Sequence, residues 1–249
     1  MTNETGPSAD LLNSAALRGE LVALFETLVN VMFCAKDTAG IYIEVNTAFV
    51  QRTGRQSKRE VIGRRASNLF APERAELYEE QDRQVIAGAG PLRDELELIR
   101  RPDGELGWYL TTKRSVDEDG VSLGLVSVSR DLQTPTEGVG VSSLQPLVSH
   151  VRDHLTDPLR NADLAKVVGC TPDQLDRRVR RVFGLSPKQY VLRVKVECAI
   201  ELLNTTSAPL ADVAHEAGFY DQPDFSRRFA RATGRTPSEF RTLGMESLG

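Results

Sequence analysis

Arginine side chains recur in a fixed pattern at two places in the C-terminal part of the sequence. From position 173 the chain reads DQLDRRVRRVFGLSPKQY, and from position 223 it reads PDFSRRFARATGRTPSEF. In this register Arg177 corresponds to Arg227, and Arg181 corresponds to Arg231. A guanidinium is always charged, and its planar fork of donors fits a phosphate or the O6 and N7 edge of guanine. The repeat therefore indicates two equivalent binding sites for a nucleic acid, whose phosphates and base edges both offer acceptors to arginine.

Helical patterns are expected to hold these arginines on an exposed face. In the first copy Thr171 has the features of an N-cap, Pro172 those of the first helical residue, and Gln174 those of the reciprocal cap partner. Apolar residues at helical spacing predict the buried stripe of this helix: Leu175, Val179, Val182 and Phe183. The second copy buries Phe225 and Phe229 in the same way, so both helices present polar and basic side chains outward.

A short helix and a glycine turn are predicted before each of these helices, over residues 163–168 and 210–217, with Gly169 and Gly218 at the turns. Residues 187–204 read as one long helix between the copies. A helix, a tight turn and a second helix with a basic face fit the major groove of DNA. Two such units on one rigid helix are expected to reach groove segments about 34 Å apart.

The charge distribution agrees with this interpretation. Residues 144–249 contain 15 Lys and Arg against 13 Asp and Glu, whereas residues 1–143 contain 16 against 22. Local charge, rather than the net charge of −4, is what a phosphate responds to. The alternative is a helical bundle whose arginines only solvate its surface, and the repetition of caps, turns and arginines at a fixed offset argues against it.

The string from Asp212 to Arg241, DVAHEAGFYDQPDFSRRFARATGRTPSEFR, resembles the signature of the AraC/XylS family of transcription regulators. The resemblance extends over residues 145–243. It implies a seven-helix, two-unit domain that binds double-stranded promoter DNA and commonly activates transcription by contacting RNA polymerase.

Carried over from this family, the candidate DNA-binding residues lie on the second helix of each unit. They are Asp173, Gln174, Asp176, Arg177, Arg180, Arg181, Gln222, Asp224, Arg227 and Arg231. Arg177 and Arg227 are expected to read guanine, while Arg180, Arg181 and Arg231 are expected to grip phosphate. The acidic residues depart from the family's usual neutral or basic choices. Carboxylates repel phosphate and accept from cytosine amino groups, so they should lower affinity and add selectivity.

The N-terminal part shows strand and turn patterns. Residues 31–46 predict a hairpin, and residues 92–100, 105–115 and 121–130 predict three further strands. Between them, Asn46 is expected to cap a helix ending at Gly54, Ser57 and Glu60 to form a capping box, and residues 72–87 to form a longer helix. This order predicts an α+β domain with an antiparallel five-stranded sheet and helices on one face.

The phrases DTAGIYIEVNTAF, RRPDGELGWY and VSVSRDLQ resemble a PAS sensory domain over residues 25–133. The resemblance implies a cup of sheet and helices for a small molecule, and often a homodimer contact through the flanking helix, here residues 11–28. The candidate pocket residues are Phe33, Ile43, Phe49, Leu69, Trp108 and Leu125. The alternative is a filled core that serves dimerisation alone, in a scaffold with no ligand and constitutive DNA binding.

The sequence disfavours several cofactors and an enzyme. Every histidine follows the linker, so the PAS-like part has none to serve as a haem ligand, and residues 55–75 hold no cysteine for flavin photochemistry. Three isolated cysteines indicate neither disulfides nor zinc. His150 and His154 lie at helical spacing but are more typical of polar surface than of a metal site. The PAS-like part shows neither a nucleophile with a matching base nor a pair of carboxylates, so its sequence does not indicate catalysis.

The expected organisation is a flanking segment over residues 1–24, a sensor or dimerisation domain over 25–133, a linker over 134–143 and a DNA-binding domain over 144–249. The stretch QTPTEGVGVSS supplies the linker composition. No run of about 20 apolar residues and no signal pattern is present, so the protein is expected in the cytoplasm. We expect a transcription regulator, an activator by its resemblance, whose operator, target genes and signal are not encoded in any readable pattern.

Overall fold

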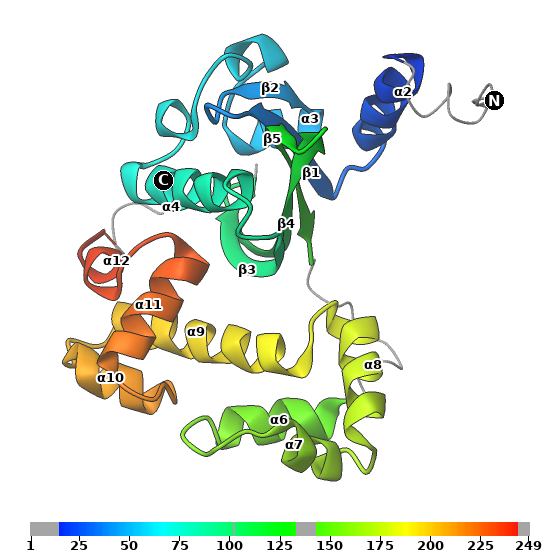
Figure 1. Cartoon of the computed structure of the whole chain (residues 1–249). Coiled ribbons are helices and arrows are strands. Elements are labelled where there is room, and N and C mark those ends of the chain that lie inside the picture. The colour runs from blue at the N-terminus through cyan, green and yellow to red at the C-terminus, as the bar shows by residue number, and fades with distance from the viewer. Residues whose placement is uncertain (1–14, 102, 133–142, 244–249) are drawn as a thin grey trace. The chain divides into compact units, whose positions relative to one another are not determined.

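The computed structural model describes residues 15–101, 103–132 and 143–243 (Figure 1). By compactness the chain divides into two units. The first contains the described residues up to Glu95 together with Thr111–Asp131, and the second contains Leu96–Leu110 and the described residues from Leu132 onward. The proposed linker, apart from Ser143, and the start of the flanking helix lie outside the described residues.

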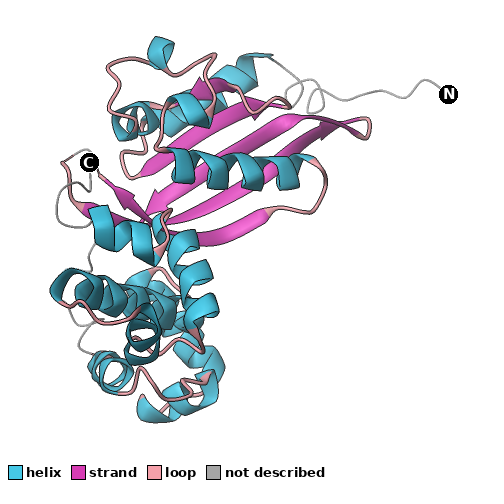
Figure 2. Cartoon of the chain, turned by 90° about the vertical axis from the view of Figure 1, so that its left-hand side faces the viewer, coloured by secondary structure: helices cyan, strands magenta, loops and turns pink. Residues whose placement is uncertain are grey.

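One antiparallel sheet has the strand order β2-β1-β5-β4-β3. Its strands are β1 (Val31–Asp37), β2 (Tyr42–Val45), β3 (Leu92–Arg100), β4 (Leu106–Glu118) and β5 (Val121–Asp131). The helices that accompany them are α2 (Ala15–Glu26), α3 (Thr47–Arg52), the 3-10 turns η1 (Lys58–Glu60) and η2 (Ala66–Asn68), and α4 (Pro72–Ile86). Figure 2 shows α4 lying across the strands. The predicted five-stranded α+β class and the order of its elements are confirmed.

The pairing of β1 with β5 fixes which side chains share a face of the sheet. Opposite residues of an antiparallel pair point the same way, and Cys34 lies opposite Ser127 while Lys36 lies opposite Leu125. Phe33 alternates with these residues and points to the other face. There its ring stacks on Phe25 of α2, with ring centroids 4.3 Å apart. At β1, one face of the sheet therefore carries polar groups, and the other carries the Phe33–Phe25 stack.

Asn46 joins the sheet to α3 as predicted. Its Oδ1 accepts from the backbone N–H of Phe49 at 3.1 Å and from that of Phe33 at 3.0 Å, and its Nδ2 donates to the carbonyls of Phe25 and Val31. The residue is almost fully buried. One amide side chain thus supplies the helix cap and ties α2, β1 and α3 together.

The predicted capping box at Ser57 and Glu60 is wrong. Ser57 precedes a 3-10 turn whose last residue is Glu60, and the Ser57 side chain makes no cap hydrogen bond to a backbone N–H of that turn. Instead the Ser57 hydroxyl and the backbone N–H of Gln56 both donate to Oε1 of Glu60. The three-residue segment is too short for a full turn of α-helix. Glu60 therefore accepts hydrogen bonds from the residues just before the segment.

The second unit holds seven helices among its described residues. They are α6 (Gln145–Asp153), α7 (Asn161–Val167), α8 (Pro172–Phe183), α9 (Pro187–Thr205), α10 (Leu210–Glu216), α11 (Gln222–Thr233) and α12 (Pro237–Leu243). The long helix α9 packs against α8, α10 and α12. Each short helix buries one stripe in a common core, with Leu175, Phe225 and Phe229 fully excluded from water. The helical, two-copy architecture expected from the repeat is confirmed.

Candidate nucleic-acid interface

Helix α8 begins and ends with the predicted local signals. The Thr171 hydroxyl accepts from the backbone N–H of Gln174 at 3.3 Å, and the Gln174 side chain accepts from the backbone N–H of Thr171 at 3.1 Å. Gly184 ends the helix in a left-handed conformation with φ of 70°. Because Leu175, Val179 and Phe183 are buried, the opposite face is left to solvent.

The exposed face of α8 carries the residues predicted from the repeat. Asp173, Gln174, Arg177, Arg180 and Arg181 are exposed, and Asp176 is half-buried. Nε of Arg180 donates to Asp176 Oδ2 at 2.8 Å, one helical turn away. This pair partly neutralises the carboxylate that the sequence places near phosphate. No ion pair joins Arg177 to any residue in the described part of the chain.

Helix α11 repeats this design with a different cap. The carboxylate of Asp221 accepts from the backbone N–H of Asp224 at 2.7 Å, and Gly234 ends the helix with φ of 73°. Asp224 Oδ1 then accepts from Arg227 at 2.7 Å and from Nε of Arg228 at 2.9 Å. One half-buried carboxylate thus holds two guanidinium groups in place. Gln222 and Arg231 are exposed on the same helix.

The turn before α11 depends on contacts that the sequence pattern did not identify. The ammonium of Lys195 on α9 donates to the carbonyl of Gly218. Burial lowers the pKa of Lys195, and the nearby Arg228 charge lowers it further, while Asp224 acts in the opposite direction. This lysine connects the turn to the helix that separates the two copies. In the sequence, Lys195 lies among the apolar residues of the predicted long helix, and the pattern gave no sign of this contact.

An exposed aromatic residue lies in the same turn. Tyr220 is 93% exposed and immediately precedes the cap residue Asp221. Burial of its neighbour Phe219 against Phe225, with ring centroids 5.0 Å apart, leaves Tyr220 to point outward. Tyr220 was not among the residues predicted from the sequence. The turn before α11 is one residue longer than the turn before α8, and this extra length was the signal in the sequence.

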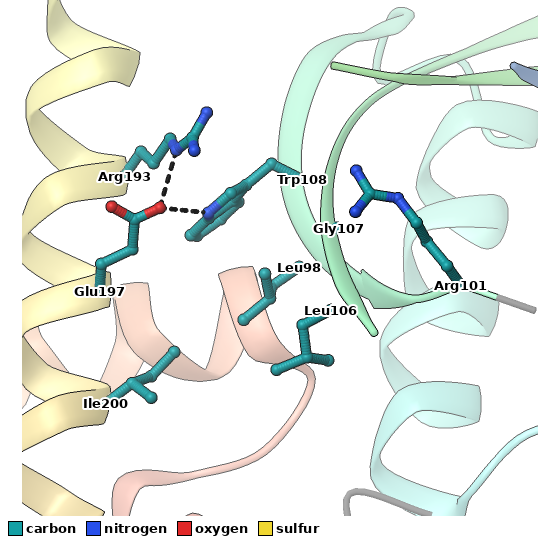
Figure 3. A pocket seen from close by; sticks show the side chains of 8 residues that line it. All are labelled: Leu98, Arg101, Leu106, Gly107, Trp108, Arg193, Glu197 and Ile200. Atoms are coloured by element: carbon teal, nitrogen blue, oxygen red, sulfur yellow. Dashed lines mark hydrogen bonds and ion pairs between the residues drawn. The ribbon is translucent and has the colours of Figure 1, made fainter. Parts of the chain in front are cut away.

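The described residues of the second unit also form a pocket of about 260 Å³ (Figure 3). Leu98, Leu106 and Ile200 supply apolar walls, and Trp108 lies beside them. The indole N–H of Trp108 donates to Glu197 Oε1 at 2.9 Å, and Nε of Arg193 donates to the same oxygen at 2.8 Å. Trp108 and Arg193 are thus both bonded to one carboxylate oxygen at this pocket (Figure 3).

The six candidate ligand-pocket residues are not brought together in one place. Phe49 and Leu69 pack against the cluster around Tyr42, and Leu125 is buried opposite Lys36. Phe33 faces α2, Ile43 is 53% exposed, and Trp108 belongs to the second unit.

Among the described residues, no group of three or more His, Cys, Asp or Glu side chains is arranged to hold a metal ion. His150 and His154 stack with ring centroids 4.2 Å apart, and Nδ1 of His154 lies 3.0 Å from the His150 carbonyl oxygen. Burial raises the pKa of the Cys34 thiol to about 11, so it is a poor nucleophile. No helix in the described ranges is long and apolar enough to cross a membrane.

Comparison with known families matches each half of the chain. Residues 164–242 match a helix-turn-helix domain, and residues 27–137 match a PAS fold. The regulatory protein SoxS of Salmonella typhimurium is 33% identical over 98 residues, a match that covers 39% of this chain and 92% of SoxS. The arabinose operon regulatory protein of Escherichia coli strain K12 is 39% identical over 95 residues, which covers 37% of this chain and 32% of that protein.

Two solved structures share the helical part. An AraC-type transcriptional regulator from Chromobacterium violaceum is 28% identical, with 43% of this chain and 95% of that chain covered and a TM-score of 0.41. The DNA-binding domain of AdpA, solved with a target DNA, is 26% identical, with 43% and 98% covered and a TM-score of 0.40. Both TM-scores are below 0.5, and the family assignment rests on the sequence relatives.

The two family matches show that the chain combines a PAS fold with a helix-turn-helix DNA-binding domain. It belongs to the AraC/XylS family of transcription regulators. The chain spans about a third of the length of the arabinose regulatory proteins that it matches.

Proposed function

We propose that the chain regulates transcription by inserting α8 and α11 into neighbouring major-groove segments of double-stranded DNA. The observation that supports this most strongly is the paired geometry of the two helices. Each has a capped start, a fully buried apolar stripe and exposed arginines at equivalent positions. Such helices meet the requirements of groove readout, in which base edges are read by arginine and amide side chains.

The proposed roles follow the exposure and pairing of the side chains. Arg177 and Arg227 read bases, and Arg180, Arg181 and Arg231 contact phosphate. Asp176 and Asp224 are expected to cost little affinity, because each already has an arginine partner on its own helix. The Oε1 of Gln174 is engaged in its capping box, and its Nε2 group is left to donate to a base edge.

The remaining parts of the proposal concern partners. We place the sensor or dimerisation function in residues 25–133 and DNA binding in residues 144–249, and, by family resemblance, propose an activator that contacts RNA polymerase in the cytoplasm. Homodimerisation through α2 is supported by exposed apolar side chains on and after this helix: Leu21, Leu24, Leu28 and Val29. Sedimentation of the wild type and of Leu24→Asp tests this, with a dimer expected only for the wild type.

The DNA-binding proposal is tested by selecting genomic fragments with the purified chain and titrating salt against the enriched sequences. One motif covering two major-groove segments is expected, with affinity lowered by Arg177→Ala and by Arg227→Ala. Transcription of a template carrying that motif, with RNA polymerase and with or without the protein, tests the sign of regulation. Weak binding that ignores both substitutions would contradict the assignment of α8 and α11.

A further inference from the structure

Residues 52–65 of the first unit, the basic loop, run from the last residue of α3 through η1 to the residue before η2. They contain six Lys and Arg against one acid, whereas the rest of residues 1–143 contains 10 Lys and Arg against 21 Asp and Glu. A charged partner responds to such a local excess rather than to the net charge. The basic loop is therefore a positive segment in an otherwise acidic part of the chain.

Four arginine side chains of the basic loop are exposed: Arg55, Arg59, Arg64 and Arg65. None of the four forms an ion pair with an acid in the part of the chain that the structure describes. Their guanidinium groups are charged at every physiological pH. The loop thus presents four permanent cations to solvent.

The acids that pair with the basic loop, or belong to it, are engaged with other residues than these arginines. The ammonium of Lys58 lies 2.6 Å from Glu26 Oε1 and 2.9 Å from Glu44 Oε1. Glu60, the one acid of the loop, accepts from the Ser57 hydroxyl at 3.2 Å. These contacts join the loop to α2 and β2 and leave the exposed arginines to a partner outside the unit.

The backbone of the basic loop is fixed by the body of the first unit. Val61 is fully buried in the cluster around Tyr42. The backbone N–H of Tyr42 donates to the carbonyl of Arg64 at 2.9 Å, and the N–H of Gly63 donates to the carbonyl of Tyr42 at 2.9 Å. Because the backbone is already ordered, binding through its arginines costs the entropy of the side chains alone.

The chemistry of the basic loop favours the phosphates of DNA as its partner. An arginine fork donates to two oxygens of one phosphate, which a lysine ammonium does not match in geometry. Segments that bind a lipid surface present a broad apolar face, whereas this loop buries Val61 and exposes Ile62 as its one apolar side chain on the surface. DNA is also the polyanion that the second unit brings to the same chain, so this inference rests on the proposed function.

We propose that the exposed arginines of the basic loop form a second DNA contact, made by the first unit to phosphates and independent of base sequence. Once α8 and α11 are bound, this contact is intramolecular, so a weak intrinsic affinity is enough to strengthen the complex. The first unit then anchors the chain on DNA, and the second unit reads the sequence.

The experiment measures the affinity of the full chain for the selected operator and for an unrelated duplex of equal length over a range of salt concentrations. The double variant Arg59→Gln with Arg64→Gln should lower the slope of log affinity against log salt by about 2, since each phosphate contact contributes about 0.9. It should weaken both duplexes by the same factor. The matched control, Arg93→Gln with Arg114→Gln, removes the same charge from exposed sites of the first unit outside the loop and should leave the slope unchanged.

An unchanged slope in the loop variant would overturn the proposal, and so would an equal fall in the control, which would show an effect of bulk charge. Binding of the wild type but not of the loop variant to phosphatidylserine vesicles, with DNA binding unaltered, would assign the loop to a lipid surface instead. Loss of a dimer in the loop variant, again with DNA binding unaltered, would assign it to an acidic face of a second copy.

The recognition-helix variants separate this proposal from the proposed function. An unchanged slope in the loop variant, with operator affinity still lowered by Arg177→Ala, refutes the basic-loop contact alone. A lowered slope on both duplexes, with no effect of Arg177→Ala or Arg227→Ala, refutes the assignment of α8 and α11 alone.

Discussion

The two helix-turn-helix copies use an equivalent glycine for different physical reasons. Gly169 has φ of 67°, and a Cβ atom on it would meet nothing within 4 Å. Gly218 has φ of 76°, and a Cβ atom there would lie 1.8 Å from the carbonyl oxygen of Leu155. The first glycine is needed for its backbone conformation alone. The second is needed for conformation and for the close approach of the loop that follows α6.

The recognition helices differ in how their arginines are held. In α8 the carboxylate of Asp176 pairs with Arg180, and Arg177 is left to solvent. In α11 the carboxylate of Asp224 holds both Arg227 and Arg228. The first copy therefore presents an exposed arginine that has no ion pair among the described residues, and the second presents two guanidinium groups paired with one carboxylate. Identical positions in a repeat need not contribute equally to binding.

The largest effect should come from substituting the two glycines. Gly169→Ala should destabilise the chain by about 1 to 2 kcal/mol, the cost of a left-handed alanine. Gly218→Ala should cost more than about 4 kcal/mol, since the backbone at Leu155 must also move. Urea unfolding of both variants measures the difference. Equal losses would show that the loop after α6 adjusts freely and that the comparison of the turns is mistaken.

The arginines should give the next largest effect. Arg177→Ala and Arg227→Ala should each weaken specific binding by about 1 to 3 kcal/mol, with the loss larger for Arg177 because Arg227 must share Asp224. Affinity for the selected operator, measured by fluorescence anisotropy at fixed salt, tests this order. A larger loss for Arg227→Ala would indicate that preorganisation by Asp224 strengthens the contact.

Phosphate contacts should change the salt dependence more than the specificity. Arg181→Ala and Arg231→Ala should each reduce the slope of log affinity against log salt by about 1 and weaken all sequences alike. Titrations on operator and unrelated DNA provide the comparison. If either variant changes base preference instead, that arginine reads a base and the proposed division of roles fails in its copy.

The smallest effect concerns two capping boxes at equivalent positions. The box before α9 uses Ser186 and the neutral Gln189, whereas Glu239 closes the one before α12 by accepting from the backbone N–H of Thr236 at 2.7 Å. This bond, with that to the Thr236 hydroxyl, lowers the pKa of Glu239. The stabilisation is therefore present above the ordinary glutamate pKa and is lost as pH falls through the lowered value.

Substituting Glu239→Gln should remove this acid-dependent part of the stability and leave the neutral-pH value nearly unchanged. The check is the difference in free energy of unfolding between wild type and variant from neutral to acidic pH. Gln189→Glu should create the same dependence in the first copy. A pH profile unaltered by both substitutions would mean that the two caps are equivalent.

Local patterns predicted much of the fold. Caps at Asn46 and Thr171 and the period of the apolar stripes act over a few residues, so the sequence displays them directly. The exposed arginines followed from the same periodicity. The approach of Gly218 to Leu155 joins positions 63 residues apart and leaves no local mark.

The interior of the first unit was harder to predict for a related reason. Charged residues are usually assigned to the surface, and Lys36, Asp82 and Lys113 meet only after β1, α4 and β4 are assembled. Aromatic residues were assigned to a pocket by type, whereas strand alternation sends Phe33 to the opposite face from Lys36. Side-chain direction, more than hydrophobicity, decides the lining of such a cup.

Trp108 is the only tryptophan of the chain, and its indole N–H donates to Glu197 of α9. Its intrinsic fluorescence therefore comes from a single indole, without any label. The carboxylate of Glu197 is a polar neighbour of the indole and is carried by α9. The emission maximum of Trp108 should therefore shift when a movement of α9 changes this contact. The molecule thus carries its own optical probe beside the helix that spaces its two recognition elements.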